Sequence, residues 1–252
     1  MGISAVIITR NEEANIARCL EGLKGLVQEV VVVDSGSTDN TRRIAEAHGA
    51  RVVERAWTNY SDQKNYANGL ATQAYILSVD ADEVPSAELA RSIRAAAAAG
   101  LHGTYRMHRL TNYCGHWVRH GGWYPDTKTR LFPKGGAHWS GDHVHEVLEP
   151  APGLPETLLR GDLLHYSYNS LEDHQERIER YSDLHAQAMF RAGRRAGVLK
   201  RWLSPLAKFM QGYLLQAGFL DGKAGWHIAV LSARAVRLKY AKLHALHHAA
   251  KA

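Results

Sequence analysis

Short apolar runs alternate with longer segments of helical periodicity through the first hundred residues. The apolar runs are rich in β-branched residues and predict strands at Ile3–Thr9, Val30–Val33, Arg51–Arg55 and Tyr75–Val79. Helices are expected from Asn11 onward, from Thr38 or Asp39 to Gly49, over Asp62–Ala71 and over Ser86–Ala99. This alternation is typical of an α/β fold, in which helices flank a Rossmann-like, mostly parallel central sheet.

Two of the expected helices begin with residues that favour helix starts. Asn11 can cap the first helix, with Glu12 and Glu13 in the following turn, where carboxylates interact favourably with the helix dipole. Ser86 marks the start of the fourth helix and Gly100 its end. The sequence therefore predicts an N-cap at Asn11 and another at Ser86.

The pattern changes after Gly100. Short β-like runs separated by Gly and Pro follow at Thr104–Leu110, Thr129–Phe132, His143–Leu148 and Leu158–Tyr168. The remaining chain is helical in its periodicity, over 171–192, 203–220 and 224–248. We therefore predict an α/β domain over residues 1–170, divided into halves at 1–100 and 101–170, and a C-terminal helical extension over residues 171–252.

Charge is distributed unevenly along the chain. The 252 residues contain 31 Lys and Arg and 25 Asp and Glu, which gives a net charge of +6. Residues 191–252 hold 12 of the basic residues and one acid, Asp221, and so carry +11, whereas residues 1–190 carry −5. A basic extension on an acidic domain suggests an anionic partner for the extension; a solvated helical face is the alternative interpretation.

Cysteine content and hydropathy bear on the cellular compartment. Cys19 and Cys114 offer neither a disulfide framework nor zinc-ligand spacing, which favours a reducing compartment. The apolar run that ends before Arg10 is too short for a signal peptide, and no stretch approaches the roughly 18 uninterrupted apolar residues of a membrane-spanning helix. These features predict a cytoplasmic protein.

Two of the expected strands lead into acidic residues, Asp34 after the second strand and the Asp80–Asp82 pair after the fourth. In an open α/β sheet, ligands bind at the carboxyl ends of the strands. Asp80 and Asp82 flank one small residue, so at strand period both side chains point to the same side. Two carboxylates this close repel each other unless a cation lies between them, and hard divalent cations take oxygen ligands. The pair therefore predicts a metal site for a diphosphate.

Four ordered motifs carry a resemblance to a known family. They are Val6–Glu13, Val32–Thr41, Gln63–Asn65 and Val79–Glu83. In sequence and order they resemble the motifs of inverting family 2 glycosyltransferases and fill the first third of the chain. The resemblance implies the GT-A fold, a UDP-sugar or other nucleotide-sugar donor, and a divalent metal, Mn²⁺ or Mg²⁺, that neutralises the leaving diphosphate.

The resemblance also implies which residues hold the donor. These are Thr9, Asn11 and Glu12 after the first strand, Asp34 and Ser35 after the second, and Lys64, Asp80 and Ala81. Asp80 and Asp82 would ligate the metal, and His165, from a late strand, would complete its coordination. Three plainer interpretations stay open: a helix cap at Asp39, a surface salt bridge at Lys64 and a structural role for His165.

An inverting transfer also needs a general base on the acceptor hydroxyl. The carboxylate pair that is usual in the family is absent, and residues 141–146 stand in its place. We favour Glu146, since His145-Glu146 resembles a branch of the family that modifies lipopolysaccharide core and peptides, with Asp142 as the alternative. By strand alternation both carboxylates would share one face, so the sequence does not separate them.

Aromatic and basic residues mark two further regions. Between the donor motifs and the expected base, we expect Trp123 in the acceptor site and Arg130 in the donor site; ordinary packing and solvation are the alternatives. In the extension, apolar residues recur at near-helical spacing over 203–220 among basic residues. This pattern suits a helix in an anionic membrane interface, or one packed on the catalytic domain.

Chain length, the Phe219–Gly222 segment and the His145-Glu146 variant together resemble lipopolysaccharide-core glucosyltransferases that act on inner-core heptose. The resemblance implies UDP-glucose as donor, a β linkage, a lipid-linked saccharide acceptor and peripheral contact with the inner face of the cytoplasmic membrane. Alternatives are a non-catalytic sugar-nucleotide or glycan-binding protein of the same fold, and a glycosyltransferase for a peptide or another envelope glycan. The Gly-rich signature of dehydrogenases is absent, and no recognition motif indicates nucleic-acid binding.

Overall fold

The computed structural model describes residues 1–141 and 146–250. It divides into two compact units. The first comprises residues 1–109 and 126–166, and the second comprises residues 110–125 and 167–252. The break after residue 166 lies close to the boundary expected at residue 170, and residues 110–125 group with the C-terminal helices. The division into functional domains stays a prediction.

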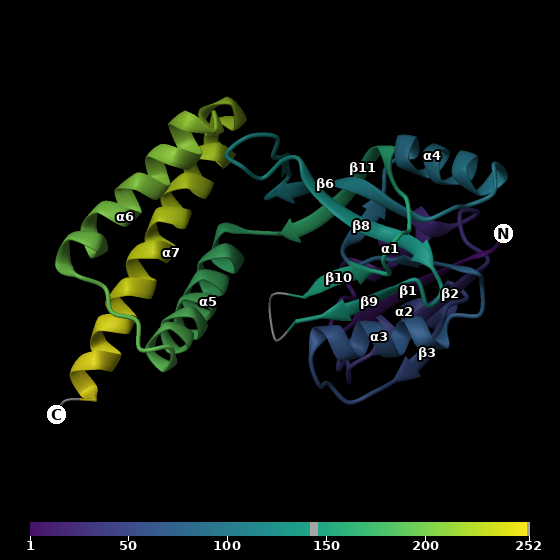
Figure 1. Ribbon diagram of the computed structural model, residues 1–252, viewed down its shortest axis with the longest axis horizontal. Helices are drawn as coiled ribbons and strands as arrows, with labels where there is room; N and C mark the ends of the chain where they lie inside the picture. The colour runs from purple at the N-terminus through teal and green to yellow at the C-terminus, as the bar shows by residue number, and fades with distance from the viewer. Residues whose placement is uncertain (142–145, 251–252) are drawn as a thin grey trace. The chain divides into compact units, whose positions relative to one another are not determined.

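The central sheet confirms the α/β class, with helices flanking a mixed sheet (Figure 1). Its parallel part has the order β3-β2-β1-β4, formed by Arg51–Glu54, Glu29–Asp34, Ile3–Thr9 and Tyr75–Ser78. These strands match the four predicted ones to within a residue or two. All three strand pairs within this part are parallel.

The sheet continues with the order β8-β6-β11-β5, formed by Asp126–Pro133, Thr104–Tyr113, Glu156–Tyr168 and Glu83–Pro85. β8 is antiparallel to both β4 and β6, and β5 is antiparallel to β11. The short β7 (His116–Trp117) pairs with β6, while β9 (Ala137–Ser140) and β10 (Val147–Pro150) form a separate hairpin. Strands that are joined by short turns pair antiparallel. The short β-like runs after Gly100 are separated by such turns, so the change of sequence pattern there agrees with the antiparallel pairing.

Strand alternation directs the apolar side chains of β1 to two cores. Ile3, Ala5 and Ile7 lie in one cluster with residues of α1 (Ile16–Leu23), α2 (Thr41–Ala47) and α4 (Ala87–Ala98). Val6 lies in the other cluster, with Ala67 of α3 (Tyr60–Leu70). β1 is covered on both faces, which agrees with its unbroken apolar run from Ala5 to Ile8. The carboxyl ends of β1, β2 and β4 are thereby held at one edge of the sheet.

Several predicted element ends are wrong. Asn11 does not cap α1: its backbone is left-handed, with φ of 55°, and the helix begins five residues later, after Asn15. The second helix begins at Thr41, after Asn40, rather than at Thr38 or Asp39. A strand was expected at His143–Leu148. Among the described residues, the strand in this region is β10, Val147–Pro150, so Glu146 lies directly before it. By contrast, Ser86 caps α4, as predicted, by accepting from the Leu89 N–H.

The second unit is built on three helices, α5 (Leu171–Arg191), α6 (Val198–Met210) and α7 (Gly222–Ala249), and Figure 1 shows α6 and α7 side by side. α6 covers the first half of the helix expected over 203–220, and a π-helical turn, η1 (Gln211–Leu215), and a 3-10 turn, η2 (Gly218–Asp221), replace its second half. At the start of α7, Gly225 lies very close to Gly218 of η2. A Cβ at Gly225 would lie 1.8 Å from the Gly218 carbonyl oxygen, so a side chain there would clash.

Within residues 1–141 and 146–250, no helix is both long and apolar enough to span a membrane.

Candidate active site

The loops after β1 and β2 are joined by hydrogen bonds at the carboxyl edge of the sheet. The Asn11 N–H donates to Ser37 Oγ at 2.9 Å, and Asn11 Oδ1 accepts from the Thr38 N–H at 2.8 Å. The Glu12 N–H donates to Thr41 Oγ1 at 2.7 Å. Asn11 therefore stabilises the contact between the two loops, instead of the helix start that its sequence position suggests.

Asp34 lies fully buried at the end of β2, opposite Thr9 in register. Its Oδ1 accepts from the Gly36 N–H at 3.0 Å and the Ser37 N–H at 2.8 Å, and the Ser37 hydroxyl donates to Oδ2. These bonds fold residues 34–37 into a turn around the carboxylate. Asp34 thus lies at the predicted edge of the sheet, where it shapes the loop that a donor would meet.

Gln63 connects this edge to α3. Its Nε2 donates to Ser35 Oγ at 3.0 Å and to the Arg55 and Ala56 carbonyl oxygens. Its Oε1 is buried and, like Thr9 Oγ1, has no hydrogen-bond partner in the part of the chain described. Buried polar atoms are rarely left unpaired, so these two mark a place where a polar ligand would improve the hydrogen bonding.

Asp80 follows β4 and is held by two cations. Lys64 Nζ lies 3.1 Å from Oδ1, and Arg130 Nη2 lies 2.8 Å from Oδ2. Burial on its own would raise the pKa of Asp80, but Arg130 and Lys64 outweigh it and hold the pKa well below its usual range. Asp80 is therefore a carboxylate at physiological pH, and it places both cations at the carboxyl edge of the sheet.

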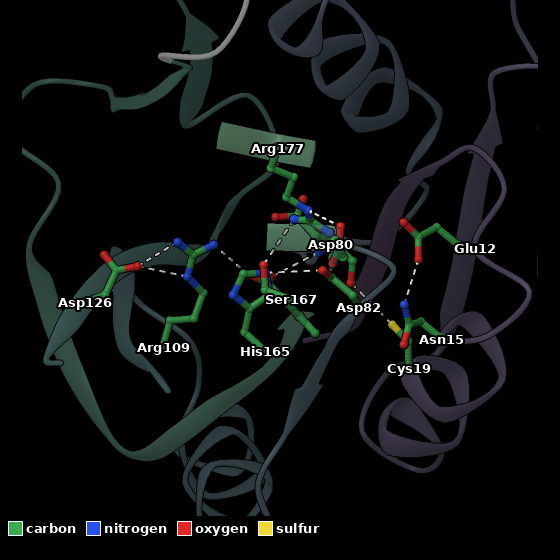
Figure 2. Close-up of polar contacts among 12 residues, drawn as sticks. Glu12, Asn15, Cys19, Asp80, Asp82, Arg109, Asp126, His165, Ser167 and Arg177 are labelled. Atoms are coloured by element: carbon green, nitrogen blue, oxygen red, sulfur yellow. Dashed lines mark hydrogen bonds and ion pairs between the residues drawn. The ribbon is translucent and has the colours of Figure 1, made fainter. Parts of the chain in front are cut away.

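Glu83 is a site residue that the sequence interpretation missed. It is fully buried, and its Oε2 accepts from the Asp80 N–H at 3.0 Å. Its Oε1 accepts from Arg130 at 2.6 Å and from Arg109 at 3.4 Å. Arg109 in turn pairs with Asp126 (Figure 2). Glu83 thus fixes the loop that carries Asp80 and Asp82. Its position directly after the Asp-x-Asp motif is the sequence feature that could have identified it.

Lys64 also brings the predicted base into this cluster. Its Nζ lies 3.4 Å from Glu146 Oε1, while the Lys64 side chain is almost fully buried. Trp139 packs beside it, with Lys64 Nζ 4.4 Å from the ring centre and the Arg130 guanidinium carbon 6.0 Å from it. Lys64 therefore joins Asp80 and Glu146 in one cluster, in which Lys64 and Arg130 both lie near the same indole ring. Lys64 is not the surface salt bridge of the plainer interpretation.

Asp82 is directed away from this cluster, toward His165 on β11 (Figure 2). Asp82 Oδ2 lies 3.2 Å from His165 Nε2, and both side chains are partly exposed. Two neighbouring ligands of one cation lie about 3 Å apart, so this oxygen–nitrogen pair fits a divalent metal such as Mn²⁺. In the described part of the chain, no three His, Cys, Asp or Glu side chains form a ready-made metal site. Metal ligation by Asp82, His165 and Asp80 stays a prediction.

The remaining predicted residues fall in different places. Ala81 is buried between the two aspartates. Asp142, the alternative base, lies outside the described residues. Trp123 belongs to the second unit, where its ring packs against Tyr113 and Tyr168 and lines a cavity of about 150 Å³. Its role in acceptor binding stays a prediction.

Comparison with known proteins gives one family match. The family model described as "Glycosyl transferase family 2" matches residues 4–147. This span begins in β1 and ends at the first residue of β10. It therefore includes both edge loops, the Asp80–Glu83 segment, Lys64, Arg130 and Glu146, but not His165.

Similar proteins cover nearly the whole chain. An "Uncharacterized glycosyltransferase" of Rickettsia felis is 32% identical over 251 residues, which are 96% of this chain and 89% of the relative. The "Lipopolysaccharide core biosynthesis glycosyltransferase LpsC" of Rhizobium meliloti is 28% identical and covers 97% of this chain and 93% of its own. Among solved structures, glucosyl-3-phosphoglycerate synthase from Mycobacterium tuberculosis, in complex with Mn²⁺, UDP and glucosyl-3-phosphoglycerate, matches with a TM-score of 0.47 and 18% identity, covering 78% of this chain and 81% of that structure.

Proposed function

This chain belongs to glycosyl transferase family 2 and is a glycosyltransferase, and we propose that it moves a hexose from a UDP-sugar to a saccharide acceptor in one inverting displacement. The observation that carries the proposal is the position of Lys64. One buried ammonium lies 3.1 Å from the Asp-x-Asp carboxylate Asp80 and 3.4 Å from the expected base Glu146. A donor-binding group and a candidate base thus belong to one cluster, as a single displacement requires.

The donor lies along the carboxyl edge of β1, β2 and β4 in this proposal. Its nucleoside contacts the joined loops that contain Thr9, Asn11, Glu12, Asp34 and Ser35. Its diphosphate lies beside Lys64, Asp80, Ala81 and Arg130, because the two buried cations there stabilise negative charge on the leaving group. Unpaired Thr9 Oγ1 and Gln63 Oε1 support a polar ligand at this edge.

A divalent metal would be held by Asp82 and His165, with Asp80 as the further predicted ligand. When bound, it supplies positive charge to the leaving diphosphate. The 3.2 Å separation of Asp82 Oδ2 and His165 Nε2 supports this assignment. Mn²⁺ and Mg²⁺ both accept carboxylate oxygen, and the imidazole favours Mn²⁺.

In the reaction, the acceptor hydroxyl oxygen forms a bond to the anomeric carbon of the sugar while the bond from that carbon to the diphosphate oxygen breaks. The hydroxyl proton passes to the Glu146 carboxylate, and UDP leaves with the electron pair of the broken bond. Glu83 keeps Arg130 and the Asp80 loop in position through its hydrogen bonds to both. Glu146 is partly exposed, so an acceptor can reach it.

The finer proposal concerns the substrates. We propose glucose as the sugar and inner-core heptose of lipopolysaccharide as the acceptor, on the motif resemblance and the 28% identity to LpsC over 97% of the chain. Such an acceptor is lipid-linked, so the enzyme would work in the cytoplasm at the inner face of the cytoplasmic membrane. A peptide or another envelope glycan is the alternative acceptor.

Donor screening tests the proposed function. Full-length protein is expected to be stabilised by UDP-sugars with Mn²⁺, and to be stabilised less by GDP- and ADP-sugars, in a thermal-shift experiment. Slow hydrolysis of the stabilising donor, followed as UDP release, would separate an enzyme from a non-catalytic sugar-nucleotide binder. Stabilisation by none of these donors would contradict the proposal.

Asp34 provides a test of the nucleoside site. Asp34→Ala is expected to weaken UDP binding, measured by calorimetry, because it removes a carboxylate that shapes the loop. Loss of a charge-assisted hydrogen bond costs about 1.5–3 kcal/mol, or roughly ten- to over a hundredfold in affinity. Asp34→Asn is the matched control, since its side-chain oxygen still accepts from the Gly36 and Ser37 N–H groups. Unchanged UDP affinity in Asp34→Ala would move the nucleoside site elsewhere.

A further inference from the structure

The second unit carries an exposed apolar surface. Its residues come from α6, η1, η2 and the first turns of α7: Leu199, Trp202, Leu203, Leu206, Met210, Leu214, Leu215, Phe219, Leu220, Trp226 and Val230. Exposed fractions reach 63% at Trp202 and 83% at Leu215. Large apolar side chains exposed together on successive elements mark a candidate interaction site.

An ordinary surface helix buries its apolar face, whereas α6 exposes it. Leu199, Leu203, Leu206 and Met210 follow one another at steps of three or four residues and so share one face. That face is exposed, and none of the described side chains of α6 is buried. By contrast, α7 buries its own apolar residues, such as Ile228 and Leu231. Among the described residues, the apolar face of α6 is thus left largely uncovered.

Charge indicates which partner fits this surface. Residues 198–249 contain eight Lys and Arg and one acid, Asp221, which is buried and accepts from the His120 N–H at 2.8 Å. Two of the eight, Arg234 and Lys242, pair with Glu179 and Asp183 of α5, so the excess of positive charge comes from the other six. The Arg237 guanidinium carbon lies 5.5 Å from the Trp202 ring centre. A second copy of the chain would bring the same positive charges face to face, which is unfavourable. An anionic surface with an apolar interior is complementary to both features.

We propose that this apolar surface docks the helical unit on an anionic membrane, with α6 lying in the interface and Trp202 and Trp226 at headgroup depth. That this membrane is the one that carries the acceptor rests on the proposed function. The exposed apolar surface is observed independently of that function. Apolar side chains enter the acyl boundary, while Lys and Arg contact anionic headgroups.

Two matched triple variants of the full chain test the proposal by co-sedimentation with phosphatidylglycerol-containing and pure phosphatidylcholine vesicles. Trp202→Ser/Leu206→Ser/Leu215→Ser removes part of the surface. Trp57→Ser/Leu158→Ser/Leu184→Ser replaces the same residue types at exposed positions outside it. The first variant is expected to lose more than about tenfold in affinity for the anionic vesicles, and the control to bind like wild type. Wild-type binding should weaken with added salt and on phosphatidylcholine.

Three results would overturn the proposal: vesicle binding by the surface variant equal to wild type, an equal loss in the control, or equal wild-type binding to both vesicle types. A wild-type dimer that becomes monomeric in the surface variant, without a change in vesicle binding, would identify a self-association interface instead. UDP affinity is measured on the same samples. Vesicle binding without UDP binding would contradict the proposed function alone, and the reverse result would contradict the docking surface alone.

Discussion

Asp82→Asn is expected to abolish glycosyl transfer while the fold remains intact. The change removes a negative charge beside His165 Nε2, at 3.2 Å, and no core volume, since the Asp82 side chain is partly exposed. A metal stabilises charge on a leaving group by several kcal/mol, which corresponds to a rate loss of more than about a thousandfold. Activity is measured as UDP release with acceptor present, and folding as the melting temperature.

The metal itself is tested alongside. Wild-type activity should vanish with chelator and return with Mn²⁺ or Mg²⁺, and calorimetry with Mn²⁺ and UDP should show weaker metal binding in Asp82→Asn. Asp183→Asn is the control, because it makes the same chemical change at an exposed carboxylate that pairs with Lys242. Full turnover by Asp82→Asn, or activity in the presence of chelator, would show that the metal assignment is wrong.

Glu146→Gln is expected to slow the chemical step by about 10²–10⁴-fold. The substitution keeps the size of the side chain and one oxygen that can accept from Lys64, so it isolates the loss of basicity. UDP affinity should hardly change, because Lys64 keeps its closer partner, Asp80, at 3.1 Å. Single-turnover kinetics with saturating donor measure the chemical step, and calorimetry measures UDP binding.

Asp142→Asn is the comparison for this prediction. If Asp142→Asn is inactive and Glu146→Gln is active, Asp142 is the base. If both turn over normally, the inverting mechanism with a base at this position is wrong. A fall in UDP affinity of Glu146→Gln equal to its fall in turnover would indicate that Glu146 acts by holding Lys64 for the donor.

Local sequence was sufficient for most elements of the fold. The strands β1 to β4 and the helices α3, α4 and α5 agree with their predicted ranges to within a few residues. Their signals are short in range: β-branched runs, apolar periodicity and capping by Ser86. The antiparallel part of the sheet was recognised by its changed pattern, but β9 was missed and β10 was expected too early in the chain, because most side chains of this hairpin are at least partly exposed and form no apolar run.

The candidate site likewise has residues that the sequence identified and contacts that only the folded structure revealed. Asp34, Asp80 and Asp82 were recognised because strand ends and close acidic pairs are visible in a single stretch of sequence. The cluster around Asp80 was decided only by tertiary structure, since Lys64, Arg130 and Glu146 come from three distant segments. Burial then sets the chemistry: Glu83 has no exposed surface, so its carboxylate must be paired, and two arginines and the Asp80 N–H are what the fold brings to it.

The C-terminal helices give the clearest case of what the sequence alone left open. Amphipathic spacing over residues 203–220 was equally compatible with a helix packed on the protein and with one at a membrane interface. Periodicity determines that the apolar side chains share a face, and it carries no information on what that face meets. Tertiary packing leaves the apolar face of α6 exposed within the second unit, while α7 buries apolar residues of its own, such as Ile228 and Leu231. The membrane as the partner of that face stays a proposal.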